Sequence, residues 1–112
     1  MVGSSACTLR GVDVRRNLIG TQIVSRGTPT ASLCRPADVL RPAIVLAAPG
    51  FIVAHNHPSG DVTPSPDDEV CTERIRAAAE MFGIDMADSI IVGRPGVKTA
   101  GYSFCTGERV LV

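Results

Sequence analysis

The sequence predicts one mixed domain of the α/β or α+β class, in which helices pack against a β-sheet. Apolar runs of strand length alternate with two segments of helical periodicity, which gives the order β-β-α-β-α-β followed by short trailing strands. The 112 residues suffice for one hydrophobic core, and 45% of them are hydrophobic against 20% charged. No linker or repeat divides the chain, so we expect a single domain over residues 1–112.

The first part of the chain predicts a β-hairpin. Residues 1–7 are small and polar, and we expect them to fray. Loose alternation in residues 9–14 predicts one strand, and β-branched residues in 18–25 predict a second. A short polar turn joins the two strands, so they should pair with each other until Gly27-Thr28-Pro29 ends the second.

The next element is a helix, expected from Pro36 to about Ala47. Proline suits the first helical position, whereas Pro42 in the interior should kink or restart the helix. The helix should stop at Pro49-Gly50, because this pair breaks regular structure. The predicted buried side comprises Ala43, Ile44, Leu46 and Ala47.

A short strand and a long helix follow. The apolar run 51–54 predicts a buried strand. The helix is expected over residues 65–82, because Ser65 suits the N-cap, Pro66 the first position and Gly83 the C-cap. Helical spacing predicts a buried stripe of Cys71, Ile75, Ala78 and Phe82.

The C-terminal part of the chain predicts strands alone. Residues 86–92 are nearly all apolar near their end, so they should form a strand buried on both faces. Gly93-Arg94-Pro95-Gly96 predicts a turn, and shorter strands are expected at 102–104 and 109–111.

The candidate functional residues lie between the strand at 51–54 and the long helix. Both histidines of the protein, His55 and His57, are one residue apart, and Asp68 follows in the first turn of the helix. Residues two apart on a strand face the same side, and a helix that begins beside the strand end brings Asp68 back toward them. Two imidazoles and a carboxylate are the ligand set of an open catalytic zinc site with water in the fourth position.

A simpler interpretation of the same segment is available. Two histidines on a strand are often ordinary polar side chains, and Ser65 with Asp68 is also a plain capping box. The string His-Asn-His is no sign of an HNH nuclease, whose motif residues are dispersed along the chain. The metal hypothesis is favoured because all of these features converge in one short segment.

Composition excludes several other classes of protein. The formal net charge is zero, so the chain has no basic footprint for nucleic acid. The apolar stretch 43–54 is broken and too short to span a membrane. A zinc deaminase is excluded because His-x-Glu and Pro-Cys-x-x-Cys are absent, and a zincin because His-Glu-x-x-His is absent.

The four cysteines are widely spaced and make no Cys-x-x-Cys pair, which excludes zinc-ribbon and thioredoxin-like sites. The first six residues lack the apolar region of a signal peptide. We therefore expect a cytoplasmic protein with buried thiols, at Cys7, Cys34, Cys71 and Cys105.

The metal segment also resembles a known family. His-x-His, seven residues, Ser, two residues, Asp is the metal motif of the JAB/MPN domain, also called JAMM. His55, His57, Ser65 and Asp68 match this spacing without a gap.

The RadC branch of that family is similar over a longer stretch. The string Ala-His-Asn-His-Pro-Ser-Gly-Asp at 54–61 and Pro-Ser-Pro at 64–66 resemble it, as do residues 24–28 upstream and 88–93 downstream. The resemblance covers nearly the whole chain from about Val12 onward. RadC proteins usually carry a further N-terminal helical region, so we expect either a stand-alone domain or a piece of a longer protein.

The resemblance implies a cytidine-deaminase-like fold, in which helices flank a curved mixed β-sheet and a metal lies at a strand end. It implies Zn²⁺ held by His55, His57 and Asp68, and a zinc-activated water that hydrolyses a peptide or isopeptide bond. Ser65 takes the place of a serine that helps to hold the developing oxyanion. The DNA-repair label of RadC proteins would add nucleic acid as a partner, which the net charge does not support. No membrane partner is expected, and the oligomeric state is not predicted.

Gln22 departs from the family pattern. The family has a general-base glutamate three residues before the serine of its Ser-Arg-Gly-Thr turn, and this sequence has Gln22 there. A glutamine can accept a hydrogen bond but cannot take a proton, and loss of a general base costs a factor of roughly 10² to 10⁴. The chain is then a weak or inactive relative, or uses another carboxylate such as Asp61 or Asp67, or carries a change made for study.

Two functions therefore remain open, a JAB-type zinc hydrolase and a non-catalytic zinc-containing module that binds protein or DNA. Strand alternation puts Gln22 and Val24 on one face and Ile23 on the other. We expect the Gln22 side chain to face the zinc-bound water. The alternative is that the second strand lies at a sheet edge and Gln22 faces solvent.

Overall fold

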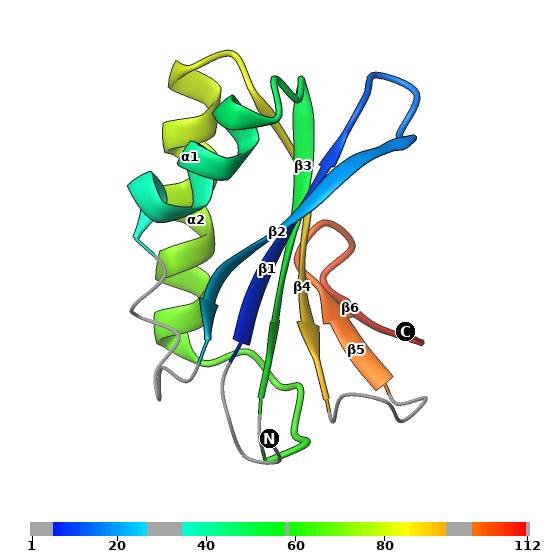
Figure 1. The fold of residues 1–112 in the computed structure, drawn as a ribbon. Helices are drawn as coiled ribbons and strands as arrows, with labels where there is room; N and C mark the ends of the chain where they lie inside the picture. The colour runs from blue at the N-terminus through cyan, green and yellow to red at the C-terminus, as the bar shows by residue number, and fades with distance from the viewer. Residues whose placement is uncertain (1–5, 27–34, 58, 94–99, 112) are drawn as a thin grey trace.

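The computed structural model describes residues 6–26, 35–57, 59–93 and 100–111, and shows a sheet with two helices on one side (Figure 1). The elements follow the predicted order, β1 and β2, α1, β3, α2, then β4, β5 and β6. The six strands form one sheet in the order β2-β1-β3-β4-β5-β6. Strands β3 and β4 are parallel and the other neighbours are antiparallel. The predicted mixed fold class is confirmed.

The strands lie close to their expected positions. Their bounds are Ala6–Val12 (β1), Leu18–Arg26 (β2), Gly50–Asn56 (β3), Asp85–Val92 (β4), Ala100–Ser103 (β5) and Glu108–Leu111 (β6). The expectation that residues 1–7 fray is wrong for Ala6 and Cys7, which belong to β1, because the Cys7 side chain is 2% exposed in the core. Residues 1–5 and the predicted turn residues 94–96 lie outside the described part.

Strands β1 and β2 pair as the predicted hairpin. In the turn between them the Asp13 carboxylate accepts hydrogen bonds from the N–H groups of Arg15 and Asn17, at 2.8 and 2.9 Å. These bonds fix the turn locally, because an aspartate side chain here takes the place of a backbone acceptor.

Helix α1 spans Pro36–Val45 and continues through Pro42 as one helix. The predicted restart at Pro42 is therefore wrong, because burial of neighbouring side chains against the sheet offsets the hydrogen bond that proline cannot make. Of the predicted buried side, Ala43 is buried, whereas Ile44 is 53% exposed. The helix ends before Leu46 and Ala47, so its buried residues are instead Val39, Leu40 and Ala43.

Helix α2 spans Pro66–Met81, with Ser65 as the N-cap and the predicted capping box in place. The predicted stripe is only partly right, since Phe82 is 66% exposed and follows the last helical residue. The residues that α2 buries are Asp68, Thr72, Ile75 and Ala79. Two of these four are polar, which an apolar pattern does not reveal.

Both helices pack on the same face of the sheet (Figure 1). Helix α1 contacts β1, β2 and β3, and α2 contacts β4 and α1. The core between the layers contains Cys7, Leu9, Val39, Leu40, Ala43, Phe51, Val53, Ile75 and Ala79. None of the helices in the described ranges is long and apolar enough to cross a membrane.

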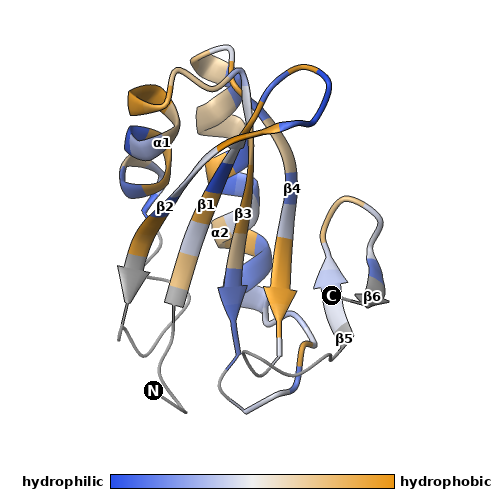
Figure 2. Ribbon diagram, turned by 45° about the vertical axis from the view of Figure 1, so that its right-hand side comes forward, coloured by the Kyte–Doolittle hydropathy of each residue, from blue (hydrophilic) through white to orange (hydrophobic). Residues whose placement is uncertain are grey.

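The central strands β3 and β4 end side by side but differ in polarity there. Figure 2 shows a hydrophilic end of β3 next to an apolar end of β4. The hydrophilic end of β3 carries His55 and Asn56. This change of polarity marks the part of the sheet where the candidate site lies.

Candidate metal centre

The candidate site lies where β3 ends in the middle of the sheet. His55 pairs with Cys7 of β1 and with Ile91 of β4, so strands hold its backbone on both sides. His57 follows the strand, and its N–H donates to the carbonyl of Val92 at 2.9 Å. Both histidines therefore start from backbone that the sheet fixes.

The loop after His57 is held by its own hydrogen bonds. The carbonyl of His57 accepts from the N–H of Gly60, whose positive φ of 86° suits glycine. The Asp61 carboxylate accepts from the N–H of Thr63 at 3.0 Å, and Val62 is buried. The loop thereby leads back over the strand end to the start of α2.

Ser65 and Asp68 bond each other reciprocally at the start of α2. The Ser65 Oγ accepts from the N–H of Asp68 at 3.1 Å, and the N–H of Ser65 donates to Asp68 Oδ2 at 2.7 Å. The Asp68 side chain is only 1% exposed. A capping box therefore fixes a buried carboxylate beside the strand end.

Asp68 lies against both histidines. Its Oδ1 is 3.2 Å from Nε2 of His55, and its Oδ2 is 3.1 Å from Nε2 of His57. One donor atom from each of the three residues lies within 4.8 Å of the other two. The structure thus brings the three predicted ligand residues together in a group that is able to hold a metal ion.

These distances suit a small tetrahedral ion. Zinc–nitrogen and zinc–oxygen bonds of about 2.0–2.1 Å at tetrahedral angles put neighbouring donor atoms about 3.3 Å apart. Each histidine Nε2 lies at a similar distance, 3.2 or 3.1 Å, from a different oxygen of the Asp68 carboxylate. Three protein donors also leave a fourth position for water or substrate, as in catalytic rather than structural zinc sites.

The protonation of His57 follows from its contacts. Its Nδ1 is 2.8 Å from the carbonyl oxygen of Asp61, which can only accept a hydrogen bond. Nδ1 therefore carries the proton, and Nε2 presents its lone pair toward Asp68 and the metal position. This second contact orients the ring as in well-defined metal sites.

Asp68 is held in its ionised form. Burial by itself raises the pKa of this carboxyl, but hydrogen bonds from His55 and from Ser65 outweigh burial. Together they hold the pKa of Asp68 well below its ordinary value. The residue is therefore a charged donor at neutral pH, which is the form that binds a cation.

Gln22 lies on the same face of the sheet as His55. It pairs with Leu9 of β1, and Leu9 pairs with Val53 of β3, two residues before His55. Cross-strand partners share a face, and two strand spacings separate β2 from β3 by about 10 Å. Strand β2 is the edge strand and the Gln22 side chain is exposed, as the alternative interpretation expected. A contact between Gln22 and a metal-bound water stays a prediction.

The face assignment on β2 is confirmed. Val24 is half-buried against the core, whereas Ile23 is 55% exposed on the opposite face. Gly27 and Thr28 of the expected turn lie outside the described residues.

The two other carboxylates considered as a base, Asp61 and Asp67, have exposed side chains. Within the described ranges, the group of metal-capable side chains contains His55, His57 and Asp68 only. Neither alternative carboxylate belongs to that group, and a role of either one as the general base stays a prediction.

Sequence reasoning missed the side chains beneath the ligands. Cys7, Cys71, Thr72 and Ser89 line a cavity of about 10 Å³ together with His55 and Asp68. Thr72 follows Asp68 by one helical turn, so the i, i+4 spacing could have indicated that both face the sheet. Ser89 carries no comparable signal in the sequence.

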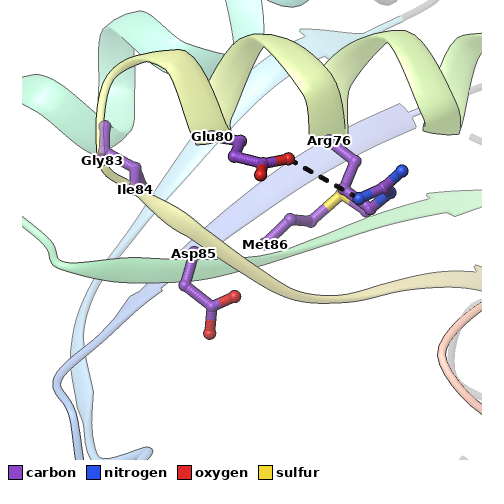
Figure 3. A pocket seen from close by; sticks show the side chains of 6 residues that line it. All are labelled: Arg76, Glu80, Gly83, Ile84, Asp85 and Met86. Atoms are coloured by element: carbon purple, nitrogen blue, oxygen red, sulfur yellow. Dashed lines mark ion pairs between the residues drawn. The ribbon is translucent and has the colours of Figure 1, made fainter.

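A larger depression, of about 380 Å³, lies at the other end of α2. Arg76 and Glu80, one turn apart on α2, form an ion pair at its wall (Figure 3). The other lining residues are Gly83, Ile84, Asp85 and Met86. Asp85 turns away from that pair, and its carboxylate is 2.9 Å from the Arg16 guanidinium. The acidic groups of this depression have cationic partners, and the depression lies at the opposite end of β4 from the metal ligands.

The described cysteines differ in exposure. Cys7 is buried, Cys71 is intermediate and Cys105 is exposed. The expectation of buried thiols is therefore wrong for Cys105, which lies in the exposed turn between β5 and β6 rather than in the core. Cys34 lies outside the described residues.

Comparisons with known proteins agree with this geometry. The family model described as "RadC-like JAB domain" matches residues 6–109. A UPF0758 protein of Thermotoga maritima is 47% identical over 85 residues, which cover 76% of this chain and 38% of the relative. A UPF0758 protein of Cyanothece sp. is 44% identical over 88 residues, covering 79% and 36%. The chain thus spans little more than a third of the length of these curated relatives.

Proposed function

Because the chain belongs to the family of RadC-like JAB domains, we propose that it is a zinc-dependent hydrolase that cleaves a peptide or isopeptide bond. One observation carries the proposal, namely the convergence of the His55, His57 and Asp68 donor atoms within 4.8 Å of one another. The buried ionised Asp68 and the oriented His57 ring add to it.

Zinc fits the chemistry of these donors, since two imidazole nitrogens and one carboxylate are a common catalytic set. A zinc ion bound there would polarise a carbonyl oxygen and lower the pKa of a bound water toward about 7. His55, His57 and Asp68 would hold the ion, and the Asp61 carbonyl would keep the His57 ring in its binding tautomer.

Ser65 is proposed to act on the substrate side of the site. Its Oγ accepts the N–H of Asp68, so its own O–H can still donate to another oxygen. An oxyanion that develops on a cleaved carbonyl is such an acceptor. In this role Ser65 accepts the capping hydrogen bond of α2 and donates a hydrogen bond to the oxyanion at the same time.

Gln22 limits the expected rate. It stands where the family has its general base, and an amide cannot take a proton. The same residue supports a second candidate function, in which the domain binds zinc and a protein or nucleic-acid partner without hydrolysis. The two candidate functions predict different effects of a glutamate at position 22: the hydrolase should become faster, and the binding module should stay inactive.

The test is the variant Gln22→Glu, assayed on peptide and isopeptide substrates beside the wild type. If the site is otherwise competent, hydrolysis should rise by roughly 10² to 10⁴, the contribution of a general base. Zinc content should not change, because residue 22 lies outside the ligand group.

Two further variants complete the experiment. Thr21→Glu puts a carboxylate on the opposite face of β2 and should leave the rate at the wild-type level. Gln22→Glu with Asp68→Ala should be inactive. An unchanged rate in Gln22→Glu, with zinc bound, would favour the binding module.

A further inference from the structure

A small cavity lies directly behind the candidate metal ligands. It is bounded by His55 and Asp68 and by the side chains of Thr72 and Ser89, with apolar groups and thiols completing its wall. Its volume is about 10 Å³. A cavity of about 10–15 Å³ is the smallest that holds one water molecule, and cavities that stay empty are apolar.

Two of the residues that line this cavity carry buried hydroxyl groups. The Ser89 side chain is 2% exposed and that of Thr72 is 9% exposed. Over the ranges that the structure describes, neither hydroxyl has a hydrogen-bond partner. Buried polar groups are almost always hydrogen-bonded, to protein or to ordered water, so two such groups beside one cavity indicate a shared partner.

The two histidines differ in how their rings are held. The Nδ1 of His57 donates to the Asp61 carbonyl, which fixes that ring. The His55 ring contacts Asp68 through Nε2, and its Nδ1 has no partner in the described part of the chain. A metal-binding histidine usually donates its other ring N–H to a neighbouring acceptor, so His55 lacks the contact that His57 has.

The positions of the hydroxyls suit the missing contact. Ser89 of β4 pairs with Val53 of the neighbouring parallel strand β3, and Val53 precedes His55 by two residues. Thr72 lies one turn after Asp68 on the face of α2 that packs on the sheet. Both residues therefore border the cavity that His55 also lines, Ser89 from the sheet and Thr72 from the helix.

We propose that Ser89 and Thr72 are positioning residues that hold one buried water molecule, which accepts the Nδ1–H of His55 in the tautomer that presents Nε2 to the metal position and so orients the ring. The water then makes three hydrogen bonds, one to each hydroxyl and one to the ring, the usual number for a buried water. The inference rests on the proposed function only in that the ring is oriented toward the proposed metal.

Matched variants test this role through the affinity of the full chain for zinc, measured by competition with a chromophoric chelator. Thr72→Val and Ser89→Ala remove a hydroxyl with little change of shape, and each should weaken zinc binding by about 10-fold to 100-fold. Thr72→Ser keeps the hydroxyl and should bind zinc like the wild type. The double variant should be little weaker than either single variant, because both lose the same water.

A purely structural role would give a different result. It would lower the thermal stability of the metal-free variants and leave their zinc affinity unchanged, which would overturn the proposal. A crystal structure of the metal-free chain gives a second measurement. Density for one water within hydrogen-bond distance of both hydroxyls is expected, and an empty cavity would contradict the inference.

These outcomes separate the inference from the proposed function. Suppose that the wild type binds zinc, that Thr72→Val and Ser89→Ala bind it more weakly, and that no variant hydrolyses substrate. This result would support the buried water and contradict the hydrolase. A Gln22→Glu variant that hydrolyses substrate, beside Thr72 and Ser89 variants of unchanged zinc affinity, would do the reverse.

Discussion

The carboxylate of Asp68 meets three neighbours at once, the imidazoles of His55 and His57 and the N–H of Ser65. Burial alone would favour the neutral carboxyl, and the hydrogen bonds from His55 and Ser65 are what keep this buried group ionised. Its spacing from the histidines was readable in the sequence, because strand alternation and a helix start are both local features. Of the residues behind it, Thr72 is indicated only by its i, i+4 spacing from Asp68, and Ser89 carries no comparable signal in the sequence.

The low pKa of Asp68 predicts how the metal-free chain responds to acid. The pKa is lower in the folded chain than the ordinary 3.8, so folding favours the ionised form. The stabilisation is complete above pH 3.8 and is lost as the pH falls through the folded pKa. The free energy of unfolding by urea should therefore fall more steeply in wild type than in Asp68→Asn between about pH 5 and about pH 2.

The control for that comparison is Asp67→Asn, which removes an exposed neighbouring carboxylate. Its pH dependence should follow that of the wild type. Parallel curves for wild type and Asp68→Asn would show that the carboxylate gains nothing from its neighbours in the folded chain.

At the scale of elements, the start of α2 combines a structural and a chemical task. The capping box was predictable, because Ser-Pro-x-Asp before a helical segment is a local pattern. The buried stripe of α2 was predicted one register away, since Phe82 is apolar yet exposed and Thr72 is polar yet buried. Site residues take part of the buried face, so the predicted stripe is right at Ile75, half-buried at Cys71 and Ala78, and wrong at Phe82.

Substitution of Ser65 separates its two tasks. Ser65→Ala removes the cap and should cost about 0.5–2 kcal/mol of stability. Ser65→Asp keeps a capping oxygen but no hydroxyl donor, so it should retain stability and lose hydrolytic activity, measured in the Gln22→Glu background. Stability comes from thermal or urea unfolding, and equal activity in the two Ser65 variants would leave the serine with capping alone.

At the scale of the whole molecule, the strand order places the candidate site at the end of a central strand. Strand β3 lies between β1 and β4, so the histidines stand in the middle of the sheet, and α2 returns over that end. The element order was predictable from alternating apolar runs. The edge position of β2, which exposes Gln22, was only one of the two arrangements expected for this residue. Sequence could not decide between them, because register and edge position depend on contacts distant in sequence.

The edge of the sheet carries apolar side chains that the domain itself does not cover. Exposed aliphatic side chains on β2, Ile19 and Ile23, lie at the edge of the sheet. The chain spans little more than a third of its curated relatives, so the activity and partners of a whole protein of that length are not fixed by this domain alone.

The most direct test of the account is the metal content of the purified chain, measured by elemental analysis after preparation without chelator. The donor geometry predicts about one zinc per chain, lost in His57→Ala and in Asp68→Ala. Asp67→Asn should keep its zinc, because that side chain is exposed and outside the ligand group. A wild type without metal, or an Asp68→Ala variant with as much zinc as the wild type, would contradict the account.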